Sequence, residues 1–334
     1  MKLVKIDFTT VSSALDNRKQ TGGPIPFNTS FHSIAEAPDL VRPNDSPYSF
    51  KSWLPLILRT RQQPITITAE AGQCPPVQTI RLTLTQTRLL LAAIEASILL
   101  QQVNRTFRED LEDEIVPLLK SSLVFPPQGL FLRLDACSPK DGAGPLALRR
   151  VEDVLLKVVT SVRVRNALVH HVDDPEGDRR VDGDGAGISG LEMFFLPFDE
   201  RMAGDREYRV FCRPGDGRVT GISQYRWYRP WRFAGLGEEE QERVAKRIVE
   251  EAEEVRGMVL DEVRHAAEED PLMRLLLEQG FSFDLFFDED HDTCSLVELN
   301  TFGVRSACGS CLFQWVRDRR VLYGSDEAEF RVAI

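Results

Sequence analysis

The sequence lacks a long uninterrupted hydrophobic run. Its most apolar stretch, LLLAAIEASILL at residues 89–100, is short and contains Glu95. A membrane-spanning helix needs about 20 consecutive apolar residues, so we expect no membrane partner. The first residues, MKLVKIDFTTVSS, also lack the apolar core of a secretory signal. These two absences predict a cytoplasmic protein.

The chain also has fewer basic than acidic residues. The chain has 41 Lys and Arg residues against 52 Asp and Glu residues, which gives a net charge of -11. This balance argues against broad binding to nucleic acid or anionic membranes, and we expect no direct nucleic-acid partner. A protein partner with a basic surface would match the negative charge of this chain better. The 6 cysteines are scattered along the chain, and we expect reduced thiols.

Several catalytic and metal-binding signatures are missing or incomplete. No Walker A motif is present, and nothing indicates a Ser-His-Asp or Cys-His catalytic set. Cys308 and Cys311 form a lone CxxC, and without a second pair we expect ordinary thiols. The match to G-x-G-x-x-G at residues 185–190 does not follow a strand, so we interpret it as a loop.

An apparent calcium-binding loop begins at Asp288 and continues through Asp290 and Asp292. The sixth position of an EF-hand loop requires glycine but holds Thr293, and the twelfth requires glutamate but holds Leu299. We therefore reject a calcium site here.

The order of predicted elements indicates an α+β fold. A chain of 334 residues is too long for one simple core and suggests two or three lobes. Helices come first, then strands mixed with helices, then antiparallel hairpins, without regular βαβ alternation. We predict an N-terminal region with helices at 1–120, a central lobe at 121–200 and a C-terminal lobe at 201–334.

The residue patterns also predict individual elements. Much of 1–48 is expected to be loop, and 48–60 and 64–69 are expected to be extended. Apolar residues at helical spacing predict one long helix or a helix pair at 86–122, a helix in the first half of 149–168, and a helix at 238–270. Strands are expected at 129–135 and 191–198, an acidic glycine-rich loop at 173–190, and hairpins at 207–227 and 281–300.

The hairpin at 281–300 contains the strongest candidate site. Asp284 lies in its first strand, and Glu298 and Asn300 lie two residues apart in its second, so both point to the same face. Pairing of the strands can bring all three together, and three oxygen donors suit Mg²⁺. The alternative is a polar face turned to water. The apolar residues around Asp284 argue against that alternative because unpaired acids beside a buried sheet are costly.

Basic residues in other predicted strands suggest a phosphate partner. Arg133 alternates with apolar residues in one strand, Arg209 lies in another, and Lys140 and Asp141 lie in the turn after the first. A buried arginine needs an anionic partner, and each could instead form a structural ion pair. A nucleoside triphosphate with magnesium would satisfy the arginines and the acids together.

Six motifs resemble, in order and spacing, those of the cell division cycle protein 123 family. They are YSFKSWLP, LFLRLDACSPKDG, EYRVFCRPGDGRVTGISQY, FDLFFDED, LVELNTFG and GSCLFQW, and together they cover roughly residues 48–317. The resemblance implies an ATP-grasp-like fold with an N-terminal helical segment, in which two lobes with antiparallel sheets sandwich ATP and magnesium. It also implies a role in assembling translation initiation factor two, by binding its gamma subunit.

The same resemblance implies roles for particular residues. The magnesium ligands would be Asp284, Glu298 and Asn300, of which Asp284 and Asn300 also belong to the nucleotide site. The remaining nucleotide contacts would be Arg133, Ser138, Lys140, Asp141, Glu192, Phe194, Leu196 and Arg209.

Three functions stay open at this point. The first is a Mg-ATP-binding assembly chaperone. The second is an ATP-grasp carboxylate-amine ligase or another phosphoryl-transfer enzyme, although no residue identifies an acyl acceptor. The third is a pseudo-ATP-grasp interaction module without nucleotide. The segment FFLPF at 194–198 supports the third, because it lacks the basic residues that the family usually has after this position.

Overall fold

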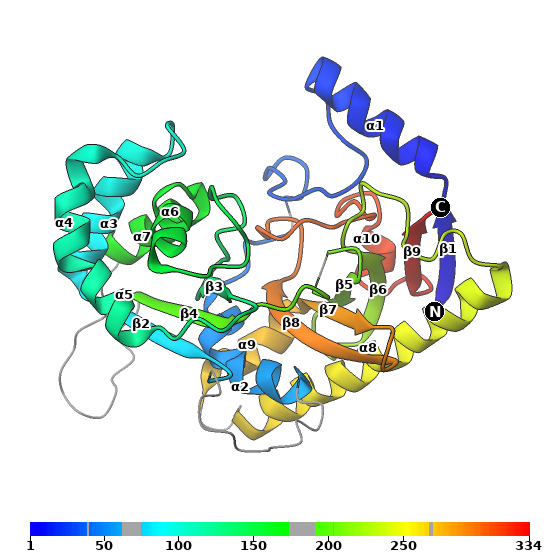
Figure 1. The fold of residues 1–334 in the computed structure, drawn as a ribbon. Helices are drawn as coiled ribbons and strands as arrows, with labels where there is room; N and C mark the ends of the chain where they lie inside the picture. Colours follow the sequence, from blue (N-terminus) through cyan, green and yellow to red (C-terminus); the bar gives the residue numbers. More distant parts are fainter. Residues whose placement is uncertain (39, 62–74, 174–190, 203, 267–269) are drawn as a thin grey trace. The chain divides into compact units, whose positions relative to one another are not determined.

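The structure is a computed structural model that describes residues 1–38, 40–61, 75–173, 191–202, 204–266 and 270–334 (Figure 1). The chain forms two compact units: unit 1 comprises residues 1–65 and 200–334, and unit 2 comprises residues 66–199. The first 65 residues join the C-terminal part because their strand pairs with the last strand of the chain and their helix at 50–61 packs on the same sheet.

Unit 1 is built on a six-stranded mixed sheet in the order β1-β9-β6-β5-β7-β8. β9 pairs in parallel with both β1 and β6, and the remaining neighbours are antiparallel. The first strand of the chain therefore lies beside the last, as Figure 1 shows. The strands are β1 (Lys2–Ile6), β5 (Glu207–Cys212), β6 (Val219–Gln224), β7 (Phe281–Asp288), β8 (Thr293–Thr301) and β9 (Glu329–Ala333).

The helices of unit 1 pack on this sheet through apolar faces. In α8, Ile248, Val255, Val259 and Val263 form a buried stripe, which confirms the expected amphipathic helix. α2 packs against β8. The helical elements are α1 (Phe8–Thr21), η1 (Ser46–Tyr48), α2 (Phe50–Arg61), α8 (Glu238–Ala266), α9 (Pro271–Gln279) and α10 (Arg319–Leu322).

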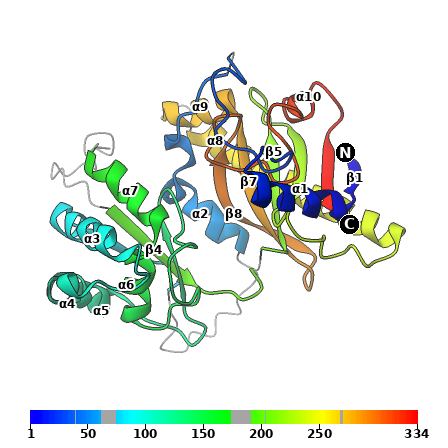
Figure 2. The same cartoon turned by 90° about the horizontal axis from the view of Figure 1, so that it is seen from above.

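Unit 2 is a three-stranded antiparallel sheet covered by helices. β4 (Leu191–Pro197) lies between β2 (Gln78–Leu82) and β3 (Leu130–Leu134). Figure 2 shows the helices α3 to α7 gathered on one face of this sheet, where they bury one continuous apolar core. The helical elements are α3 (Leu84–Ser97), η2 (Arg105–Phe107), α4 (Arg108–Glu114), α5 (Val116–Ser122), α6 (Val151–Val159) and α7 (Val162–Asp173).

Several predictions about elements are confirmed. The strand at 129–135, the buried strand at 191–198 and both hairpins are present, and the order of elements makes the protein α+β. In the β5–β6 hairpin, Gly215 and Gly217 adopt positive φ angles of 94° and 63°, which explains the choice of glycine in that turn. No helix in the described residues is long and apolar enough to cross a membrane.

The expectation for residues 48–60 was wrong, because this segment is helical. Phe50, Trp53, Leu56 and Ile57 recur at helical spacing and are buried, and the Trp53 indole N–H donates to the Pro47 carbonyl at 2.8 Å. Pro55 lies inside the helix, where it removes a backbone donor. The free energy gained by burying the apolar face therefore exceeds the cost of placing proline inside the helix.

Three other expectations were wrong in part. The region 1–48 contains β1 and α1, and α1 has clear boundary signals: Asp7 accepts from the Thr9 amide at its start, and Gly22 has a φ of 66° at its end. The region 86–122 forms three helices and a 3-10 turn. The second half of 149–168 is also helical, as part of α7. The expected strand at 64–69 and the loop at 174–190 lie outside the described residues.

Candidate functional site

Strand pairing in unit 1 brings the predicted acidic and basic residues together. Arg209 of β5 is directly opposite Asp284 of β7, and Asp284 is directly opposite Glu298 of β8. Residues opposite one another on paired strands lie on the same face of a sheet. Asn300 shares this face because it lies two residues beyond Glu298. The predicted set Arg209, Asp284, Glu298 and Asn300 is therefore one cluster within a single sheet.

Arg209 and Asp284 form a buried bidentate ion pair. The Arg209 Nε and Nη2 atoms each donate to a different Asp284 oxygen at 2.7 Å. Arg209 Nη1 donates to the Gly309 carbonyl, also at 2.7 Å, and its guanidinium lies 5.1 Å from the centre of the Tyr225 ring. The exposed fractions are 5% for Arg209 and 1% for Asp284. Such a pair is stable only when its hydrogen bonds are satisfied, and here they are.

The cluster nevertheless has more negative than positive charge. Burial raises the pKa of Asp284 from 3.8 to about 7; Arg209 opposes this effect and Glu298 adds to it. The Asn300 amide also approaches Asp284, with its nitrogen 3.5 Å from an Asp284 oxygen. One guanidinium thus faces two carboxylates, and an added cation would lower the electrostatic energy of the cluster.

The donor chemistry of this cluster fits Mg²⁺. Two carboxylates and one amide are hard oxygen donors, and magnesium in proteins commonly uses one or two carboxylates and takes the rest of its shell from water and phosphate. Asp284 Oδ1 accepts from Arg209 Nε, whereas Oδ2 accepts from Arg209 Nη2 and faces the Asn300 amide nitrogen. Within the described residues there is no group of three or more His, Cys, Asp or Glu residues suited to a metal. The third donor here is an amide.

The loop with the CxxC motif supports Arg209 and is not reactive. Cys308 and Cys311 are free, buried thiols, and burial raises the pKa of each to about 12. A protonated thiol is a poor nucleophile and metal ligand. Gly309, between them, supplies the carbonyl that accepts from Arg209. A Cβ there would clash with the Asn28 Oδ1 atom, so a larger residue would require the Asn28 side chain to move.

Asp288, the residue before the turn at 289–292, is engaged in contacts within and beside that turn. Asp288 Oδ2 contacts the His291 ring nitrogen at 3.0 Å and Arg201 at 2.8 Å, and its Oδ1 accepts from the Asp290 amide. Its side chain therefore holds the turn together, in agreement with the rejection of an EF-hand loop.

Four predicted nucleotide contacts share one face of the unit 2 sheet. Leu132, Met193 and Phe195 point to the helix-covered core. By strand alternation, Arg133, Glu192, Phe194 and Leu196 lie on the opposite face. Arg133 is paired in register with Phe194, and Glu192 forms an ion pair of 2.8 Å with Arg81 across the β2–β4 ladder.

The turn after β3 is held by the helices of unit 2. Asp141 accepts from the Ser161 hydroxyl at 2.6 Å and from the Arg163 amide at 3.2 Å, so it caps the start of α7. Lys157 of α6 donates to the Gly142 and Gly144 carbonyls at 2.7 and 3.0 Å. Ser138 is buried in this turn, whereas Lys140 is exposed.

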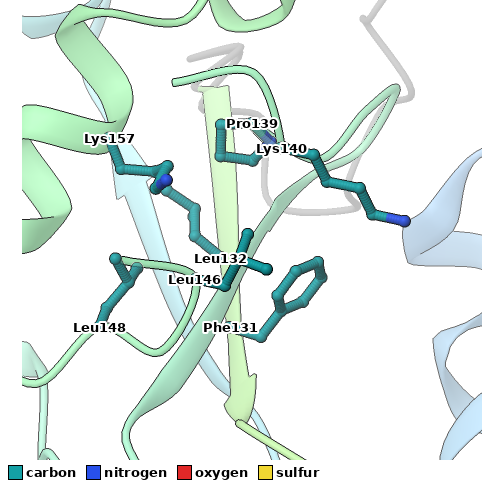
Figure 3. Close-up of a pocket in the computed structure, with 7 residues that line it drawn as sticks. All are labelled: Phe131, Leu132, Pro139, Lys140, Leu146, Leu148 and Lys157. Atoms are coloured by element: carbon teal, nitrogen blue, oxygen red, sulfur yellow. The ribbon is translucent and has the colours of Figure 1, made fainter. Parts of the chain in front are cut away.

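Lys140 and Lys157 line the same small cavity, of about 10 Å³ (Figure 3). The figure shows Lys140 extending away from Lys157. The cavity has room for no more than about one water molecule, so it is not a ligand pocket. Sequence reasoning missed Lys157, although a single lysine on the apolar face of VEDVLLKVV is a signal for a buried, hydrogen-bonded ammonium.

Comparisons with known proteins add evidence on the fold. A scan of protein-family models and a search of curated proteins gave no match. Solved structures do match, and with the two sheets described above they define the class as an α+β fold. The chain is similar to Cdc123 from Schizosaccharomyces pombe, with a TM-score of 0.53 and 19% identity, over 88% of this chain and 99% of that one. A C-terminally truncated form of the same protein gives the same TM-score and identity, over 92% and 99%.

The likeness confirms the fold that the sequence motifs implied, a Cdc123-like fold. Arg209, Asp284, Glu298 and Asn300 come together in unit 1, and Arg133, Glu192, Phe194 and Leu196 share a face in unit 2. Their roles toward a nucleotide and a metal stay predictions.

Proposed function

We propose that this protein is a Mg-ATP-binding assembly factor that works on translation initiation factor two by binding its gamma subunit. The observation that carries the proposal is the pairing of two carboxylates, Asp284 and Glu298, on one face of the β7–β8 hairpin. A buried carboxylate with a raised pKa beside a second carboxylate is typical of a cation-binding site.

Magnesium would be held by Asp284, Glu298 and Asn300. When bound, it would neutralise charge on the phosphates of ATP. Arg209 positions Asp284 through its two hydrogen bonds and contributes positive charge to the same face. Because Arg209 is itself fixed by Gly309 and Tyr225, the acids are held in place before any ligand arrives.

Unit 2 contains the other residues that the family resemblance assigns to a nucleotide. Arg133 and Lys140 would face phosphate oxygens, while Ser138 and Asp141 would shape the turn that approaches them. Glu192, Phe194 and Leu196 would contact the adenine. Asp141 already caps α7, so its part in this site is to fix the turn rather than to touch the ligand.

The assembly role rests on the Cdc123-like fold and on the ordered sequence motifs. The net charge of -11 suits a partner with a basic surface, and we propose a cytoplasmic protein without nucleic-acid or membrane partners. No described side chain marks an acyl acceptor, and we therefore favour an assembly factor over a ligase.

One observation favours a second candidate, an interaction module without nucleotide. Arg209 already contacts both oxygens of Asp284, so that carboxylate is compensated without a metal. Thermal unfolding distinguishes the two candidates. Mg-ATP at millimolar concentration raises the melting temperature if it binds the folded protein, and leaves it unchanged for the interaction module.

A binding experiment tests the assembly role directly. The purified chain is immobilised and offered the isolated gamma subunit, with and without Mg-ATP. We expect retention of the subunit that increases with Mg-ATP. In the Asp284→Ala variant this increase is lost, whereas Asp290→Asn, an exposed acid on the same hairpin, keeps it. No retention in either condition would refute the proposed partner.

A further inference from the structure

Unit 1 contains a cavity that is larger than the one beside Lys157 in unit 2 and that the hairpin acids do not line. Its volume is about 360 Å³, within the range of small-molecule sites. Its wall comes from the last turn of α1, the segment that follows α1, and one residue near the C-terminus. The lining residues are Arg18, Gly22, Gly23, Pro24, Ile25, Asn28, Thr29, Ser30, Phe31, His32, Glu36 and Gln314. None of them belongs to the proposed Mg-ATP site.

His32 is the most informative residue of this cavity. Its side chain is only 7% exposed, and its Nε2 atom is buried without a hydrogen-bond partner among the described residues. Its Nδ1 atom lies 3.3 Å from a Glu36 oxygen, and its backbone N–H donates to the Val304 carbonyl. Buried polar atoms are nearly always hydrogen-bonded, so an unsatisfied Nε2 beside a cavity indicates a missing partner.

Glu36 fixes the proton on the other ring nitrogen. The Ser33 backbone N–H and hydroxyl donate to Glu36 at 2.8 and 2.9 Å, and these bonds, together with His32, lower the pKa of Glu36. An ionised carboxylate only accepts hydrogen bonds, so the Nδ1 atom of His32 carries a proton. The Nε2 atom can then donate only when the ring is positively charged.

Two amide side chains and one guanidinium of the wall present hydrogen-bond donors. The Asn28 side-chain oxygen accepts from the Cys311 amide, and the Gln314 side-chain oxygen accepts from the Arg317 amide. The Arg18 guanidinium forms no ion pair with any described residue and is exposed. The Phe31 ring, 59% exposed, and Pro24 add apolar surface. A ligand that satisfies this wall accepts hydrogen bonds and is negatively charged.

We propose that this cavity binds a small anionic molecule of the carboxylate or phosphate class, whose anionic group contacts Arg18 and the Nε2 atom of His32. Arg18 and Glu36 are the other charged residues that line the cavity, and Glu36 is occupied by Ser33 and His32.

The test uses the full-length chain with inorganic phosphate and succinate as separate probes. Calorimetry gives the affinity, and assigned histidine ring resonances report locally on His32, so that phosphate bound elsewhere does not confuse the result. We expect at least one probe to bind and to shift the His32 signals. A better response to phosphate or to succinate identifies which anion class the cavity selects.

Three variants decide the assignment. His32→Gln should weaken binding at least about tenfold, or about 1.4 kcal/mol. Arg18→Gln should weaken it at least about threefold, or about 0.7 kcal/mol. Lys19→Gln removes the same charge from the next residue, which does not line the cavity, and should leave affinity unchanged. If His32→Gln fails to fold, Arg18→Gln still decides, because Arg18 is exposed.

Two results would overturn the proposal. One is the absence of any His32 shift with either probe at millimolar concentration. The other is equal affinity in wild type, His32→Gln and Arg18→Gln.

Discussion

Replacing Glu298 with glutamine should stabilise the protein in the absence of metal and nucleotide. Glu298 faces Asp284 across the β7–β8 ladder and raises the pKa of that buried acid. Opposite side chains in such a ladder have Cβ atoms about 5 Å apart. Two charges at that distance repel by about 3 kcal/mol at an effective dielectric constant near 20. Glutamine keeps the shape and removes the repulsion.

The effect should depend on pH in a defined direction. The pKa of Asp284 is raised from 3.8 to about 7, so the folded protein keeps a proton that the unfolded chain releases between about pH 4 and pH 7. Stability contributed by this group therefore falls as the pH rises through that window. Glu298→Gln lowers the pKa of Asp284 and makes this fall smaller. The variant should exceed wild type by about 1 kcal/mol near pH 7.5 and lose this advantage near pH 4.

Denaturant unfolding followed by tryptophan fluorescence measures this change selectively. All 4 tryptophans, Trp53, Trp227, Trp231 and Trp315, belong to unit 1, the unit that contains both acids. Asp290→Asn serves as the control, because an exposed acid of the same hairpin should change stability by less than about 0.5 kcal/mol. If Glu298→Gln is less stable than wild type near pH 7.5, or differs equally at all pH values, the two acids do not repel as described.

Two further predictions concern local structure. Lys157→Met should destabilise unit 2 by about 2 kcal/mol and increase proteolysis of the turn after β3, because the Gly142 and Gly144 carbonyls lose their donor. Lys120→Met, a change at an exposed lysine, should alter neither the stability nor the proteolysis. If the two variants behave alike, Lys157 does not hold the turn. Pro55→Ala should stabilise unit 1 by about 1 kcal/mol in denaturant titration, because a helix regains a backbone hydrogen bond. A loss of stability would indicate that the segment is not helical in solution.

The hairpins could be predicted from the sequence because their signals are local. Alternation predicts which residues within β7, and which within β8, share a face. The turn alone would pair Asp284 with Val297; the register shift between Asp284 and Leu285 puts Asp284 opposite Glu298 instead, and the sequence pattern does not specify that shift. The pairing of Arg209 with Asp284 requires β5 to lie beside β7, although the two strands are 68 residues apart between Cys212 and Phe281. No local pattern specifies such a neighbour.

The errors came from segments whose structure depends on distant partners. β1 exists because it pairs with β9, at the other end of the chain. α2 is helical despite Pro55 because its apolar face is buried in unit 1. The second, donor-lined cavity escaped notice for a similar reason, since it joins residues 18–36 to Gln314.

Calorimetric titration of Mg-ATP into wild type and Glu298→Gln tests the central claim most directly. Glu298→Gln is expected to be the more stable protein, so weaker binding cannot be attributed to a damaged fold. We predict that the wild type binds one Mg-ATP and that Glu298→Gln binds at least about tenfold more weakly, a loss of about 1.4 kcal/mol. Equal affinity in the two proteins, or no binding to wild type, would contradict the assignment of a Mg-ATP site to the β7–β8 hairpin.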